Sequence, residues 1–99
     1  MTYRETIESV IKMNEELIRG STDDIKMFSK EIAEQRKKDK EMVEWVWSSG
    51  VVTEWEMNYY NKDYKSDTTR KLMNRRAWEY RFRKRLENSN REWKEMLAE

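Results

Sequence analysis

Residues 42–57 read MVEWVWSSGVVTEWEM, and the conformation of this stretch decides whether the chain is all-helical. Its valine, tryptophan and threonine content is typical of a β-hairpin that turns at the Ser-Ser-Gly segment, residues 48–50. Neither strand register gives a clean apolar face, because one sets Glu44 opposite Glu54 and the other sets glutamates opposite apolar side chains. The hairpin is therefore the less favoured alternative.

A helical reading explains the same stretch better. The Ser-Ser-Gly segment then serves as a turn, and Thr53 with Glu56 forms a capping-box pattern that satisfies free backbone N–H groups at a helix start. A further helix would open there and run through Trp55 and Tyr60. We therefore predict an all-α fold: a small antiparallel helical hairpin or bundle of three to four helices, in a single domain over residues 1–99.

The segment before this stretch shows two amphipathic patterns. The first predicts a helix over residues 3–19, with Thr2 and Glu5 as a capping box and Gly20 as the terminating residue. Its apolar side chains recur at three- and four-residue spacing. They are Tyr3, Ile7, Val10, Ile11, Leu17 and Ile18.

The second pattern predicts a helix over residues 23–48, capped by the Ser-Thr-Asp-Asp segment at 21–24. Its apolar stripe stops at the polar run 34–41 and resumes in register, so the run lies in solvent or on a partner, or the helix splits there. The apolar positions are Ile25, Phe28, Ile32, Met42 and Val46. Two ion pairs at i,i+4 spacing would support the polar run: Glu34 with Lys38 and Lys40 with Glu44.

The last segment predicts one long helix that starts at the cap cluster Ser66-Asp67-Thr68. The polar triplet Asn88-Ser89-Asn90 interrupts it chemically, as a kink or as the cap of a separate short helix. The apolar stripe stays in phase across the triplet. It comprises Leu72, Trp78, Phe82, Leu86, Trp93, Met96 and Leu97.

The residue types that the chain lacks exclude several classes of function. The chain has no His, Cys or Pro and only two glycines, so it lacks the usual ligands of zinc, the usual nucleophile–base pairs and a phosphate-binding glycine loop. We expect no metal, no cofactor and no enzymatic activity. The lack of cysteine, of a long apolar run and of a signal-peptide pattern predicts a soluble cytoplasmic protein.

One candidate partner-binding feature is a basic and aromatic segment over residues 68–87. Cations with interleaved aromatic rings are typical of nucleic-acid binding, and they also suit an acidic protein partner. The structural alternative is that these cations lie over aromatic rings or pair with the acidic segment 41–63. The segment contains Arg70, Lys71, Arg75, Arg76, Trp78, Tyr80, Arg81, Phe82, Arg83, Lys84 and Arg85.

The other candidate feature is aromatic crowding between residues 45 and 64. Trp45 and Trp47 point about 160° apart on a helix, so burying both in one small monomer is difficult. Exposed Trp and Tyr are favoured interface anchors, whereas the structural alternative makes them the core. The crowded residues are Trp45, Trp47, Trp55, Tyr59, Tyr60 and Tyr64.

These features support three functional hypotheses. The first is a non-catalytic interaction protein that binds or inhibits another macromolecule, such as a viral or mobile-element regulator of a host nucleic-acid-processing or defence complex. The second is direct RNA or DNA binding through 68–87, and the third is a structural homo-oligomer. The candidate partner-binding residues are Trp45, Trp47, Trp55, Arg70, Arg75, Arg76, Trp78, Arg81, Phe82, Arg83 and Arg85.

Overall fold

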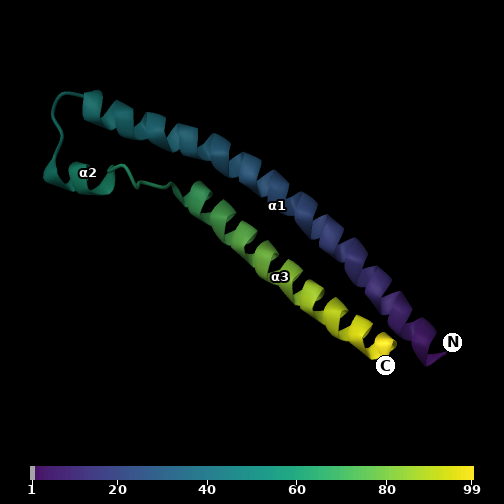
Figure 1. Ribbon diagram of the computed structural model, residues 1–99. Coiled ribbons are helices and arrows are strands. Elements are labelled where there is room, and N and C mark those ends of the chain that lie inside the picture. Colours follow the sequence, from purple (N-terminus) through teal and green to yellow (C-terminus); the bar gives the residue numbers. More distant parts are fainter. Residues whose placement is uncertain (1) are drawn as a thin grey trace. The chain divides into compact units, whose positions relative to one another are not determined.

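The computed structural model describes residues 2–99, and it contains three helices (Figure 1). Helix α1 spans Tyr3–Ser48, α2 spans Glu54–Tyr59 and α3 spans Asp67–Ala98. Across residues 2–99 there is no strand, so the all-α prediction is confirmed and the hairpin alternative at 42–57 is wrong. The reason is local: the turn ends α1, and the capping box starts α2.

The chain divides into two compact units. The first unit combines the residues up to Met27 with Arg76–Glu99, and the second unit is Phe28–Arg75. The first unit is thus a pairing of two helical segments rather than a bundle. The second unit contains the last part of α1, all of α2 and the first turns of α3.

The predicted break at Gly20 is wrong, because α1 is one helix of 46 residues. Gly20 lies inside it, and the predicted cap residue Ser21 is instead buried against Glu79. A glycine inside a helix costs about 1 kcal/mol, which the packing of one continuous buried face offsets. The helix also continues through 34–41, where the two expected i,i+4 ion pairs are not formed between the described side chains.

A seven-residue repeat explains why α1 is continuous. Its buried side chains all fall in two rows of heptad spacing, the pattern of paired helices in coiled coils, and the half-buried Ile18 and Gln35 continue those rows. The first row is Ile7, Asn14, Ser21, Phe28 and Gln35. The second row is Ile11, Ile18, Ile25, Ile32, Asp39 and Val46. Tyr3, Leu17 and Met42, which were predicted in the apolar stripe, are exposed.

Helix α3 has the same repeat, with polar residues in both rows. One row is Thr69, Arg76, Arg83, Asn90 and Leu97, and the other is Leu72, Glu79, Leu86 and Trp93. The predicted members Trp78 and Met96 are exposed, because the true seam passes through polar positions that an apolar pattern overlooks. The helix runs unbroken across the Asn-Ser-Asn triplet, so the separate short helix is wrong.

In the first unit the two segments are antiparallel, with the start of α1 beside the end of α3 (Figure 1). Buried polar contacts set their register. Asn14 Nδ2 donates to Asn90 Oδ1 at 2.8 Å, and Asn90 Nδ2 donates to the Ile11 carbonyl at 3.1 Å. Ser21 Oγ donates to Glu79 Oε2 at 2.8 Å, so two separate levels of the pair are matched by hydrogen bonds.

The two glycines should respond in opposite ways to alanine. Nothing lies within 4 Å of a Cβ built on Gly20, so Gly20→Ala should raise the free energy of unfolding by up to about 1 kcal/mol. Gly50 has φ +93°, so Gly50→Ala should lower it by about 1 kcal/mol. Urea unfolding followed by circular dichroism measures both. A loss of stability in Gly20→Ala would contradict a continuous α1.

The buried asparagine pair should show the cost of an unsatisfied polar group. Asn14→Ala leaves Asn90 Oδ1 without its donor and should lower the free energy of unfolding by about 1 to 3 kcal/mol. The double variant Asn14→Leu with Asn90→Leu should recover most of that loss, since no polar group is then left unpaired. Asn88→Ala, on the exposed side of α3, is the matched control and should change stability by less than about 0.5 kcal/mol.

Candidate interaction surface

The turn after α1 and the start of α2 form as the sequence predicts. Gly50 takes positive φ after the helix end, and the Ser49 hydroxyl donates to the Val46 carbonyl at 2.6 Å. Thr53 Oγ1 accepts from the Glu56 N–H at 3.1 Å, while the Thr53 N–H donates to Glu56 Oε1 at 3.3 Å. This reciprocal box starts a helix that has no buried residue, so capping and ring contacts hold α2.

Aromatic rings connect α2 to the segment that follows it. Trp55 stacks on Tyr59 with ring centroids 5.0 Å apart, and Tyr59 meets the edge of Tyr60 at 4.8 Å. Tyr64 contacts both tyrosines, at 5.6 Å and 5.0 Å. Trp47 on α1 donates its indole N–H to the Tyr60 carbonyl at 2.7 Å. These contacts hold the rings in one arrangement, although α2 itself has no buried residue.

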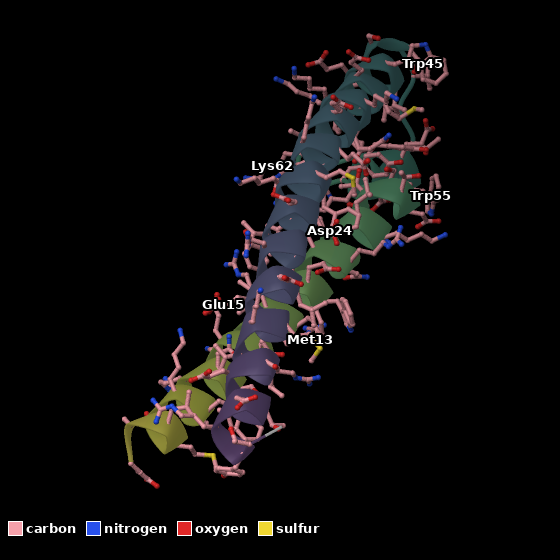
Figure 2. All side chains as sticks on the ribbon, turned by 90° about the vertical axis from the view of Figure 1, so that its right-hand side faces the viewer. Met13, Glu15, Asp24, Trp45, Trp55 and Lys62 are labelled. Carbon is pink, nitrogen blue, oxygen red and sulfur yellow. The ribbon has the colours of Figure 1, made fainter. Side chains whose placement is uncertain are left out.

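Most of these large side chains are exposed. Trp45 is 70% exposed and Trp55 is 65% exposed, and both stand away from the ribbon in Figure 2. We call this exposed group in the second unit the aromatic surface. It comprises Trp45, Trp47, Val51, Trp55, Met57 and Tyr59.

The interpretation that the tryptophans form the core is wrong. The buried apolar side chains of residues 2–99 are Ile7, Ile11, Ile25, Phe28, Ile32 and Val46. A seam between two helices buries a narrow strip, so it has few positions that could bury a whole indole ring, and the one tryptophan in it, Trp93, is half-buried.

Asp39 fixes the start of α3 and so the segment that carries the tyrosines. It is buried, and its Oδ2 accepts from Thr69 Oγ1 at 2.6 Å and from the Ser66 N–H at 3.2 Å. Burial would raise the pKa of Asp39, but the hydrogen bonds from Thr69 and Ser66, with Arg36 nearby, outweigh burial and lower it. Ser66 also caps α3, as predicted, by accepting from the Thr69 N–H at 3.3 Å.

A groove lies beside this anchor in the second unit, with a volume of about 480 Å³. Four cations line it: Arg36, Lys37, Lys40 and Lys62. Ala33, Val43 and Tyr64 add apolar lining, and Asp39 and Glu44 add the carboxylates. We call it the basic groove. Burial and the neighbouring Tyr59 and Tyr60 raise the pKa of the Tyr64 phenol, which keeps that ring neutral and apolar.

Two of the three cations of α3 in the second unit have partners there, and Lys71 is exposed. The Arg75 guanidinium lies over the Phe28 ring at 5.5 Å, and Arg70 is 4.0 Å from Asp67. The contact of Arg75 with a ring is the kind that the structural alternative predicted, although the ring belongs to α1.

In the first unit the basic residues of α3 are divided between the seam and the surface. Arg83 reaches Glu87 at 3.5 Å and lies over the Tyr80 ring at 5.3 Å. Arg76 is half-buried, whereas Arg81 and Arg85 are exposed. Trp78 is exposed and stacks on Phe82 at 5.2 Å.

Sequence reasoning missed Asp39 as a buried hydrogen-bond acceptor, and it missed the groove. The signal was present, because Asp39 falls on the heptad row that passes through Ile32 and Val46. A polar residue on such a row predicts a buried hydrogen bond to the partner helix.

Comparisons with known proteins identify no relative: no protein-family model, no curated protein and no solved structure matches the chain. Among the helices of residues 2–99, none combines the length and apolar character needed to cross a bilayer. Function must therefore be inferred from the chemistry of the described side chains.

Stability should fall in acid because of Asp39. A carboxyl whose pKa is lowered by folding stabilises the fold above its unfolded pKa, and this contribution is lost as the pH falls through the folded pKa. Asp39→Asn should therefore be about 1 to 2 kcal/mol less stable than the wild type at neutral pH, and the difference should shrink as the pH falls from neutral into acid. Urea unfolding across that range measures it. Asp24→Asn, exposed on the same helix, is the control for the same change of charge.

Proposed function

We propose that this chain is a non-catalytic interaction protein whose aromatic surface binds another protein. The observation that carries the proposal is the exposure of Trp45 and Trp55 in one unit, where Trp55 stacks on Tyr59. Large exposed apolar groups that gather in one region of a monomer mark interaction sites, and Trp and Tyr supply most of the binding energy at such sites.

Preorganisation supports this function. The stack of Trp55 on Tyr59 and the hydrogen bond from Trp47 to the Tyr60 carbonyl hold the rings before any partner arrives. Side chains that are already ordered lose less conformational entropy on binding, so more of the contact energy appears as affinity. A chain without a large core can use its aromatic residues in this way.

Local charge favours a protein over a nucleic acid at this surface. Glu44, Glu54 and Glu56 lie beside or between the exposed tryptophans in sequence, and their carboxylates would repel a phosphate backbone. Occupying a surface is also how an inhibitor of a larger complex works. The part of the proposal that concerns a viral or mobile-element inhibitor rests on the composition of the chain alone.

Variants of the exposed tryptophans should lose partner binding without losing the fold. Trp45→Ala and Trp55→Ala should each weaken partner binding at least about tenfold, because each removes an exposed anchor. Their far-ultraviolet circular dichroism should match that of the wild type. Trp78→Ala is the matched control, since Trp78 is an exposed, stacked tryptophan of the first unit.

The measurement is affinity capture from host lysate with nuclease treatment, followed by titration of the purified captured protein. Unchanged affinity in both Trp45→Ala and Trp55→Ala would contradict the proposal. Tight binding to bare RNA or DNA that falls steeply between about 50 and 200 mM salt would favour the α3 alternative instead. A dimer that Trp45→Ala dissociates would assign the surface to a second copy of the chain.

A further inference from the structure

The basic groove carries more positive charge than the fold uses. Its four cations face two carboxylates, of which Asp39 is already hydrogen-bonded to Thr69 and Ser66. Within residues 2–99 no ion pair holds Lys37, Lys40 or Lys62. All three lysines are exposed, so their charges are available to a ligand.

The groove also has an apolar part. Ala33 and Val43 come from α1, and the neutral Tyr64 ring comes from the segment before α3. A volume of about 480 Å³ is within the range of roughly 300 to 1,000 Å³ that is usual for ligand sites. Apolar lining with nearby cations fits a ligand that has an apolar side chain flanked by negative charge.

Ring contacts connect the basic groove to the aromatic surface. Tyr64 lines the groove and contacts Tyr59, which belongs to the aromatic surface, with ring centroids 5.6 Å apart. Glu44 of the groove directly precedes Trp45 in α1. One partner can therefore engage both sites within the second unit.

We propose that the basic groove receives an acidic segment of the protein partner, with an apolar side chain against Val43 and Tyr64 and carboxylates at Lys37, Lys40 and Lys62. This inference rests on the proposed function, because it assigns the chemistry of the same partner. A peptide is favoured over a polyphosphate, since Ala33 and Val43 offer an apolar side chain a contact that a polyphosphate cannot use.

A defined probe tests the inference with the full chain. A short synthetic peptide that alternates Glu and Leu is titrated while the amide signals of Ala33, Val43 and Tyr64 are followed by nuclear magnetic resonance. We expect saturable shifts confined to the groove, weaker in about 500 mM salt because exposed charges are then screened. A peptide that alternates Gln and Leu should bind at least about tenfold more weakly, since its contacts lack charge.

Matched variants test whether the acidic peptide contacts the lysines of the basic groove. Lys37→Gln with Lys40→Gln should weaken binding of the acidic peptide at least about fivefold, and Lys62→Gln should act in the same direction. The control is Lys30→Gln with Lys38→Gln, which makes the same charge change on the same helix outside the groove lining. Equal loss in the control would overturn the inference, as would tighter binding of inorganic phosphate or oligothymidylate than of the peptide.

The captured partner separates this inference from the proposed function. If binding of the partner is weakened by both Trp45→Ala and the Lys37/Lys40 variant, both stand. If it is weakened by Trp45→Ala and not by the Lys37/Lys40 variant, the proposed function stands and the groove assignment fails. If Trp45→Ala, Trp55→Ala and the Lys37/Lys40 variant all leave it unchanged, both fail.

Discussion

Both units depend on one constraint: a polar side chain buried in a helix seam must find a hydrogen-bond partner. In the first unit Asn90 meets Asn14 and the Ile11 carbonyl, and in the second Asp39 meets Thr69. Each buried side-chain nitrogen and oxygen in the described part of the chain is satisfied. A shifted register would leave such groups unpaired, at a cost of about 1 to 3 kcal/mol each. A purely apolar seam would not penalise a shifted register in this way.

The same seam explains why the aromatic residues between 45 and 59 lie outside it. Paired helices bury a narrow strip, and polar side chains such as Ser21 and Asn14 occupy part of that strip. Aliphatic residues and Phe28 fill the rest of the buried positions, and the large exposed rings of residues 45–59 remain at the surface. Their order comes from stacking and from the Trp47 hydrogen bond rather than from burial. A fold with little core thereby presents much apolar area to a partner.

Asp39 contributes both to the fold and to the basic groove. Its carboxylate holds the start of α3, and it also lines the basic groove. The segment that carries Tyr60 and Tyr64 is therefore held at α3 by Asp39 and at α1 by Trp47. Surfaces held at both ends lose little freedom on binding, which is the physical basis for treating the aromatic surface and the basic groove as preformed.

The sequence by itself determined the features that depend on neighbouring residues: the all-α class, the turn at Gly50, the capping box at Thr53 and the start of α3. Each is a local backbone hydrogen-bonding requirement that a few side chains meet. Only the tertiary structure decided that α1 continues through Gly20, that no tryptophan is buried and that Asp39 lies in a seam. Those outcomes depend on what the opposite helix presents, and helix pairing can override a local stop signal when the buried face is continuous.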